Sequence, residues 1–249
     1  MMLITAETPV REIVVADPAA IPVLEKFGID YCCGGKHSLA DACTKRNHDV
    51  TAVIEQLERQ ASGKNATGTD WQTAPLKDLI AHIVQHHHAF ARQHLELIRE
   101  LAFKVQRRHG ASHPEIFKLV EELAVIRAEL THHFSCEEDV LFPHIEQLEK
   151  SGQPVAHPVF ANIQQPVTRM IMDHNQTGAE LRVVREATNN YVPPADACTT
   201  FRALYRALEE LERDLHQHIH LENNILFPRA VQLESEVSND LSCITASRE

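Results

Sequence analysis

The strongest constraint on the fold is an apolar pattern that occurs twice in the chain, with an offset of 85 residues. In each copy the pattern advances in alternating steps of three and four residues, which is the spacing of one buried face of an α-helix. The copies are Ile116, Leu119, Leu123, Ile126, Leu130, His133, Glu137 and Val140, and Phe201, Leu204, Leu208, Leu211, Leu215, His218, Glu222 and Ile225. The repeat predicts two equivalent helices whose apolar faces line one core.

Two further helical patterns of similar length complete this part of the chain. The four predicted helices cover residues 75–108, 114–148, 164–189 and 196–234, with Gly-, Ser-, His- and Pro-containing breaks between them. Only 8 Gly and 5% aromatic residues disfavour a protein of strands and turns. The sequence therefore predicts an all-α fold with an antiparallel four-helix bundle over residues 71–235.

Shorter helices are predicted before the bundle. Residues 17–28, 38–46 and 50–60 each begin at or close after a capping Asp or Ser and carry apolar residues at helical spacing. We expect a small three-helix domain over residues 1–60, a polar linker at 61–70 and an irregular tail at 236–249. The core of the small domain is predicted to contain Val23, Leu24, Phe27, Leu39, Val53, Ile54 and Leu57.

Charge and composition exclude several classes of function. A formal charge of -11 argues against nucleic acid as a partner, because such domains present a basic surface. The chain has no apolar run of 18 residues and no signal-peptide pattern, so we expect a cytoplasmic protein without a membrane segment. Six cysteines in such a protein are expected to be thiols or metal ligands, since the cytosol is reducing.

The polar residues within the repeat are the main candidates for a functional site. His133 and Glu137, like His218 and Glu222, are four residues apart and so share one helix face. Buried imidazole and carboxylate groups are costly unless they are paired or bind a metal. A single pair of this kind is usually a satisfied ion pair in the core or part of a solvated face. Its duplication, with Leu-Phe-Pro following each copy, favours a metal site.

The other two helices offer one histidine each. His174 lies on the apolar stripe of the third helix. In the first helix, helical steps from His88 meet only apolar residues, whereas steps from His87 meet His94, so His88 is the better candidate. His86 is predicted to be exposed, and for His87 exposure remains an open alternative.

These six side chains predict a di-iron centre. Six ligands are too many for one tetrahedral zinc, whereas two metals bridged by both carboxylates use all of them. Nitrogen and oxygen ligands in a helical bundle favour iron and, less strongly, manganese. Copper or zinc could occupy the site in the purified protein without being the working metal. The alternative is a metal-free bundle with internally paired polar groups. The predicted ligands are His88, His133, Glu137, His174, His218 and Glu222.

The remaining polar candidates are weaker. His82, His94, His132, His216 and His220 are expected at the surface or behind the ligands, and Glu138 and Asp139 are expected to be solvated. Cys136, Cys198 and Cys243 lack a partner at metal-ligand spacing, and no role is predicted for Cys43. The neighbouring Cys32 and Cys33 precede Gly34, Gly35, Lys36 and His37, and these flanking charges are expected to favour thiolates. They therefore predict a reactive or metal-transferring dithiol; the alternative is two small buried apolar residues.

Together these motifs resemble a known family. The loop of residues 30–36, Trp71 at the start of the bundle, both His-x-x-x-Glu motifs with their Leu-Phe-Pro, and the segment Pro193–Thr200 are similar to the repair-of-iron-centres proteins of the YtfE/ScdA type. The resemblance runs from about Pro9 to Gln232.

It implies an N-terminal cysteine-bearing domain joined to a haemerythrin-like bundle with a non-haem di-iron centre. It also implies repair of iron-sulfur clusters damaged by nitric oxide or oxidants, with damaged or apo iron-sulfur proteins as partners. The six predicted ligands match the family's ligands by position, and Cys32 and Cys33 match its cysteine pair, at which we expect thiol exchange or iron transfer.

Ordinary haemerythrins have more histidine and only one glutamate of this kind. We therefore expect a more anionic and more labile centre here, suited to donating iron.

Several alternatives stay open at this stage. Reduction of nitric oxide by the centre would make the chain an enzyme. A haemerythrin-like protein that binds or senses nitric oxide or oxygen without turnover is the main alternative function. The oligomeric state is also open, and a homodimer through the N-terminal domain would bring two cysteine pairs together.

Overall fold

A computed structural model of the chain describes residues 2–61 and 69–246, and the side chains up to residue 238. Most of the predicted linker, residues 62–68, lies outside the described residues. The chain divides into two compact units. The first consists of Met1–Pro75 with His216–Arg229, and the second of Leu76–Leu215 with Ala230–Glu249.

The N-terminal helices of the first unit are short. They are α1 (Val10–Ala16), the 3-10 turn η1 (Pro18–Ala20), α2 (Ile21–Lys26), α3 (Leu39–Lys45) and α4 (Val50–Ala61). Side chains cap two of them, since Asp17 accepts a hydrogen bond from the amide of Ala19 at 2.9 Å and Ser38 accepts one from the amide of Asp41 at 3.1 Å.

The expected number of three helices in this region is wrong, because α1 precedes them. Its sequence is rich in β-branched residues, which have low helix propensity, so the sequence alone gave no helix signal. Val10, Ile13 and Val14 bury one face of α1 in the domain core, and this tertiary burial stabilises the helix.

Most of the predicted core of the small domain is buried. Phe27 and Ile54 are only partly buried and pack against its edge. The fully buried members include Ile13, Leu24, Tyr31, Leu39, Cys43, Val53 and Leu57, together with Ile219 from the fourth long helix.

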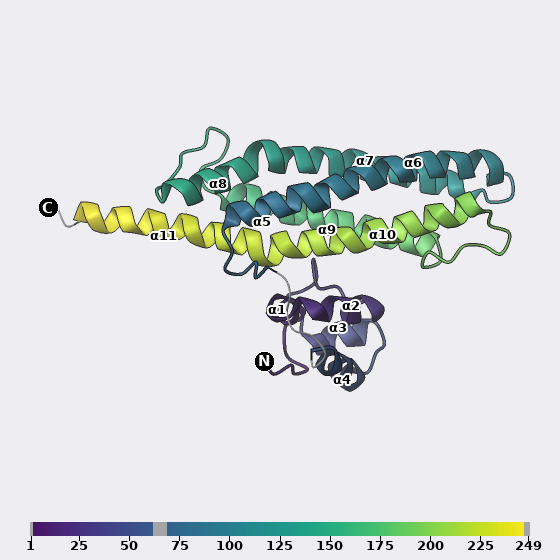
Figure 1. The fold of residues 1–249 in the computed structure, drawn as a ribbon, viewed down its shortest axis with the longest axis horizontal. Helices are drawn as coiled ribbons and strands as arrows, with labels where there is room; N and C mark the ends of the chain where they lie inside the picture. The colour runs from purple at the N-terminus through teal and green to yellow at the C-terminus, as the bar shows by residue number, and fades with distance from the viewer. Residues whose placement is uncertain (1, 62–68, 247–249) are drawn as a thin grey trace. The chain divides into compact units, whose positions relative to one another are not determined.

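The long helices form a four-helix bundle in which consecutive helices run in opposite directions (Figure 1). Three of the four are α-helices interrupted by a π-helical segment, η2, η3 or η4. They are α5 (Leu76–His82), η2 (Ile83–His88) and α6 (Ala89–His109); α7 (Glu115–Cys136), η3 (Glu137–Leu141) and α8 (Phe142–Ser151); α9 (Gln164–Ala187); and α10 (Thr199–Leu221), η4 (Glu222–Leu226) and α11 (Phe227–Ala246).

The bundle core lies in the second unit and follows the repeated apolar pattern. Ile116 and Ile126 of α7 and Phe201 and Leu208 of α10 are buried there, along with Ile98 of α6. Burial of each such side chain contributes about 1.5–3 kcal/mol relative to an exposed position. The apolar face therefore holds the helices in the register that determines where the polar residues of the repeat meet.

The all-α prediction is confirmed. Among the described residues the one β-type contact is an isolated bridge between Pro9 and Ser38. Residues 236–246 continue α11 instead of forming the expected irregular tail, because no Gly or Pro interrupts the chain after Pro228. In the part of the chain that the structure describes, none of the helices has the length and apolar character needed to cross a bilayer.

Candidate metal centre

The predicted ligands come from all four long helices. His88 ends η2, His133 lies on α7, His174 on α9 and His218 on α10. Glu137 and Glu222 are the first residues of η3 and η4. All six residues are buried, with exposures between 0% and 6%.

Three of the four long helices contain a π-helical segment next to predicted ligands. η2 ends at His88, η3 follows α7 and η4 follows α10. One extra residue per turn shifts the helical phase, so Leu141 is buried after Glu137, whereas Val140 is only partly buried. The expected position of Val140 on the buried face is thus wrong by one residue. Such π segments are common at functional sites, and here two of the three begin at the glutamates and the other ends at His88.

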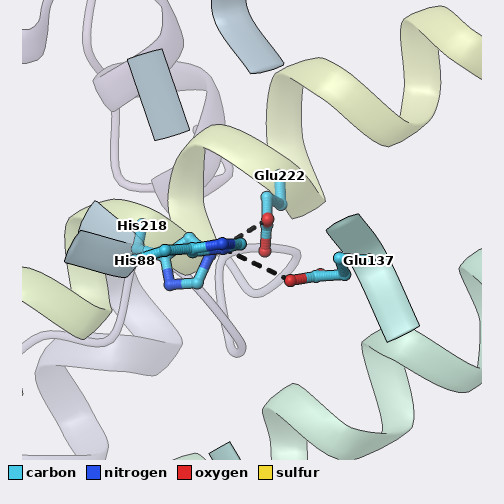
Figure 2. Close-up of side chains that lie close together, drawn as sticks. All are labelled: His88, Glu137, His218 and Glu222. Carbon is cyan, nitrogen blue, oxygen red and sulfur yellow. Dashed lines mark ion pairs between the residues drawn. The ribbon is translucent and has the colours of Figure 1, made fainter. Parts of the chain in front are cut away.

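Glu137 is surrounded by three of the predicted histidines. One of its oxygens lies 3.1 Å from Nε2 of His133 and 3.9 Å from Nε2 of His174. Its other oxygen lies 3.4 Å from Nε2 of His88. Glu222 has an oxygen 3.0 Å from Nε2 of His218 (Figure 2).

These side chains form two overlapping groups that could hold a metal ion, in each of which the ligand atoms lie within 4.8 Å of one another. The first is His88, Glu137, His218 and Glu222, and the second is His133, Glu137, His174 and Glu222. The structure therefore brings all six predicted side chains together, and both groups contain both glutamates. This is the arrangement that two cations sharing two carboxylates require.

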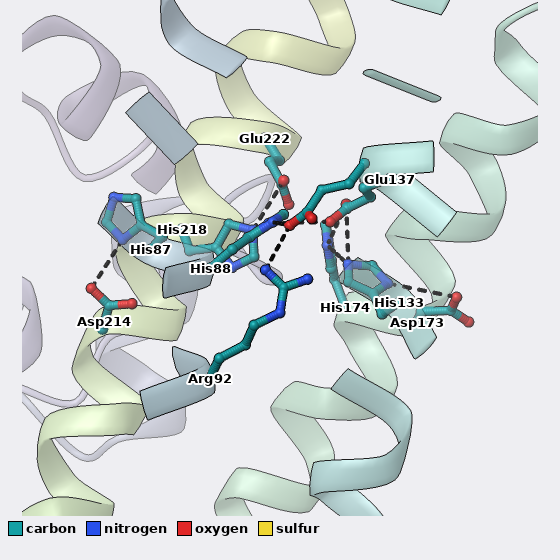
Figure 3. A network of polar contacts seen from close by, with 11 residues as sticks. His87, His88, Arg92, His133, Glu137, Asp173, His174, Asp214, His218 and Glu222 are labelled. Carbon is teal, nitrogen blue, oxygen red and sulfur yellow. Dashed lines mark hydrogen bonds and ion pairs between the residues drawn. The ribbon is translucent and has the colours of Figure 1, made fainter. Parts of the chain in front are cut away.

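Two of the histidines point nitrogens at each other. Nε2 of His133 and Nε2 of His174 are 3.0 Å apart in a buried position (Figure 3). Without a cation, one of the two must carry a proton for this contact to be favourable. Converging imidazole lone pairs and buried carboxylates are a donor set of nitrogen and oxygen, which suits iron.

Glu138 holds His88 in a defined orientation. Its carboxylate accepts hydrogen bonds from Nδ1 of His88 at 2.6 Å and from the Arg92 guanidinium at 2.9 Å. Burial would raise the pKa of Glu138, but these two hydrogen bonds outweigh it and lower the pKa. Because an ionised Glu138 only accepts, Nδ1 of His88 carries a proton, and Nε2 is the ring nitrogen that faces Glu137 and could bind a metal. The expectation that Glu138 is solvated is wrong.

A second acidic residue lies behind His133. Nδ1 of His133 is 3.8 Å from a carboxylate oxygen of Asp173, which in turn contacts the guanidinium of Arg169 at 3.0 Å. Figure 3 shows this contact on the opposite side of the centre from the paired His87 and Asp214. Asp173 therefore resembles Glu138 in its position behind a predicted ligand, although its contact is longer.

The other histidines divide between the surface and the interior. His86 is exposed as expected, whereas His87 is buried and its Nδ1 lies 3.0 Å from Asp214, which rules out the alternative of an exposed His87. His220 is also buried, and burial lowers its pKa to about 4. His132 is exposed, and His82, His94 and His216 are partly buried.

The cysteine loop, residues 30–35, is organised by Asp30. The carboxylate of Asp30 accepts hydrogen bonds from the amides of Cys32 at 3.1 Å and Cys33 at 2.9 Å. Cys32 is buried, and its thiol donates to Asp30 at 3.4 Å. The hydrogen bond to Cys33, burial and the charge of Asp30 raise the pKa of Cys32 well above its usual value. The expectation that the flanking charges favour a thiolate is thus wrong for Cys32, because its hydrogen bond to Cys33, its burial and the charge of Asp30 outweigh them.

The remaining described cysteines are separate from these groups. Cys43 is buried in the core of the small domain, and Cys136 lies 3.6 Å from Nε2 of His132. Cys198 is exposed before α10, with Nε2 of His109 at 3.1 Å.

Comparisons with known proteins agree with this geometry. Residues 78–230 match the haemerythrin HHE cation binding domain, which defines the class of the bundle. Residues 6–61 match ScdA_N, a domain of unknown function.

Similar proteins extend over most of the chain. The iron-sulfur cluster repair protein YtfE of Citrobacter koseri is 37% identical over 226 residues, which are 90% of this chain and 97% of the relative. The protein of the same name from Pectobacterium atrosepticum is 38% identical over 223 residues, 90% of this chain and 96% of the relative. The chain belongs to the family of YtfE iron-sulfur cluster repair proteins.

Proposed function

We propose that this protein repairs iron-sulfur clusters damaged by nitrosative or oxidative stress, using a di-iron centre that supplies iron or processes nitric oxide. The observation that carries the proposal is that both candidate metal groups contain Glu137 and Glu222. The relatives named for iron-sulfur cluster repair, which match 90% of the chain, support the same function.

The donor set fits iron. Four imidazoles and two carboxylates provide nitrogen and oxygen ligands, and a carboxylate can bridge two ions through its two oxygens. A bound pair of ions would supply redox chemistry and a binding position for a small molecule such as nitric oxide. It would also satisfy the buried charge of Glu137 and Glu222, whose side chains have 0% exposure.

The protein's own residues set the protonation states around the centre. Glu138 keeps the proton of His88 on Nδ1, so that Nε2 is available as a ligand atom. The contact between His133 and His174 has to lose its proton when both nitrogens become ligands. Loading of the centre should therefore release protons and become weaker as the pH falls.

Cys32 and Cys33 are proposed to serve as the exchange point at which thiols accept or pass on iron. Cys32 is buried, whereas Cys33 is partly exposed and can be reached by a partner. Thiolates bind iron and zinc more strongly than oxygen ligands do, so a pair of thiols can take over a cation that two carboxylates and four imidazoles release.

Metal analysis and repair assays test this function. Protein purified anaerobically from iron-replete cells should contain about two iron atoms per chain. Glu137→Ala and Glu222→Ala should each lose iron, because each removes a carboxylate common to both groups. Cys32→Ala/Cys33→Ala should keep the iron and lose the ability to restore a damaged iron-sulfur protein. Full repair by the double variant would remove the cysteines from the mechanism.

Titration of the reduced protein with nitric oxide distinguishes the alternative function. A stable nitrosyl complex, no nitrous oxide and no transfer of iron to an apo-ferredoxin would indicate a protein that binds or senses nitric oxide without turnover. Iron-free protein with unchanged folding would instead contradict the di-iron centre.

A further inference from the structure

The cysteine loop places three potential ligand side chains around one point, separate from the six residues of the candidate metal centre. Asp30, Cys32 and Cys33 each offer a ligand atom, and these atoms lie within 4.8 Å of one another. The hydrogen bonds from the amides of Cys32 and Cys33 to Asp30 wrap the loop around the carboxylate. Both thiols are thereby brought to the same side as Asp30.

The distances in the loop match those between the ligands of a tetrahedral cation. With metal–sulfur bonds of about 2.3 Å and metal–oxygen bonds of about 2.0 Å, tetrahedral geometry places two sulfurs about 3.8 Å apart and a sulfur and an oxygen about 3.5 Å apart. The observed distances are 3.7 Å between the Sγ atoms of Cys32 and Cys33 and 3.4 Å between Sγ of Cys32 and Oδ1 of Asp30. The loop needs little rearrangement to accept a cation.

We propose that Asp30, Cys32 and Cys33 form a binding site for one divalent cation of borderline softness, such as Fe²⁺ or Zn²⁺. Three protein ligands leave the fourth tetrahedral position open, as in zinc sites that exchange a ligand. A partner thiolate can occupy that position, so the cation can leave. Transient binding of iron at this site during cluster repair rests on the proposed function, whereas the binding site itself does not.

The loop is held in place by side chains that immediately follow Glu222 in the chain. The side-chain amide of Asn223 donates a hydrogen bond to the carbonyl oxygen of Cys32 at 3.4 Å, and that of Asn224 donates one to the carbonyl oxygen of Tyr31 at 3.1 Å. The hydroxyl of Tyr31 donates to Glu25 at 2.9 Å. These contacts fix the backbone before Cys32 and between the two cysteines, which preorganises the site for a ligand.

Binding of the cation has a fixed proton balance. Each thiol that becomes a ligand gives up its proton, and the ionised carboxylate gives up none. One cation bound by both thiols and Asp30 therefore releases two protons to the solvent, with no oxidation or reduction.

Cobalt(II) is a suitable probe, because thiolate ligation gives an intense near-ultraviolet charge-transfer band that imidazole and carboxylate ligation does not. The full-length, iron-loaded protein is reduced and titrated with Co²⁺ under anaerobic conditions. We expect the band to saturate at one equivalent, with two protons released. Cys33→Ser should weaken cobalt binding by more than about a hundredfold, beyond the loss typical of an outer-shell partner. Asp30→Asn, which keeps an acceptor for the loop amides, should weaken it by at least about tenfold.

Cys198→Ser is the matched control, since it removes an exposed thiol outside the loop. The proposal is overturned if the wild-type protein shows no thiolate band, if Cys33→Ser keeps the band, or if Cys198→Ser loses it. A normal cobalt titration in a protein without repair activity would refute the proposed function and leave the cation site standing. Repair activity without cobalt binding would refute the cation site and leave the proposed function standing.

Discussion

Replacement of Glu138 by glutamine tests whether residues behind the ligands set the affinity of the centre. Glu138 accepts from Nδ1 of His88 at 2.6 Å and from Arg92 at 2.9 Å, and its side chain is 27% exposed. Glutamine has nearly the same shape but no charge, so it no longer fixes the tautomer of His88. Loss of such a partner lowers metal affinity by about 10- to 100-fold, which equals about 1.4–2.7 kcal/mol.

Competition between the protein and a chromophoric chelator for iron measures this affinity directly. Asp139→Asn is the matched control, because Asp139 is the next residue, is exposed and undergoes the same change of charge. We expect Glu138→Gln to lose iron at a chelator concentration about 10- to 100-fold lower than the wild type and Asp139→Asn to behave as the wild type. Equal affinities in all three proteins would refute the role of Glu138, and equal losses in both variants would indicate a general effect of charge.

Three further substitutions test the fold. Arg185→Ala leaves the buried carboxylate of Glu212 without the guanidinium 3.2 Å away, and should lower the free energy of unfolding in urea by roughly 2–4 kcal/mol. Gly35→Ala would place a Cβ 2.6 Å from the carbonyl oxygen of Tyr31, and should destabilise the small domain by about 2 kcal/mol in thermal unfolding. Burial lowers the pKa of His144, so its contribution to stability is present above pH 6.5 and is lost below it. In urea unfolding at pH 7 and pH 5, His144→Leu should therefore lose less stability than the wild type on acidification.

Each of these expectations has a clear contrary result. Arg182→Ala removes an exposed arginine of the same helix and should change stability by less than about 0.5 kcal/mol. A similar small change in Arg185→Ala would show that Glu212 is satisfied by other groups. Unchanged thermal unfolding of Gly35→Ala would mean that the loop shifts to admit the methyl group. Identical pH dependence of wild type and His144→Leu would show that the pKa of His144 is the same in the folded and unfolded states.

The sequence predicts the long helices well because their apolar faces are continuous. Ile116 to Leu130 and Phe201 to Leu215 are buried as the steps of three and four require. Prediction fails where burial, and not the local sequence, determines the structure. The helix α1 is an example, since Val10, Ile13 and Val14 favour extended structure until they pack into the core of the small domain.

The residues of the candidate centre were predictable only in part. The repeat identifies His133, Glu137, His218 and Glu222 because two polar pairs interrupt otherwise apolar faces. It does not identify Glu138, because an ideal helix turns the residue after an inward-facing one away by about 100°. The π-helical segment changes the angle between successive side chains, and the sequence pattern did not predict this segment.

The two copies of the repeat diverge directly after each glutamate, and this divergence separates two tasks. After Glu137, Glu138 orients His88 through a charged hydrogen bond. After Glu222, Asn223 and Asn224 bind the backbone of the cysteine loop. Both sets of residues lie in π-helical segments, where the extra residue per turn lets side chains next to a glutamate reach neighbouring groups. The duplicated part of the motif thus supplies two equivalent pairs of predicted ligands. The residues that follow orient His88 in one half and hydrogen-bond the backbone of the cysteine loop in the other.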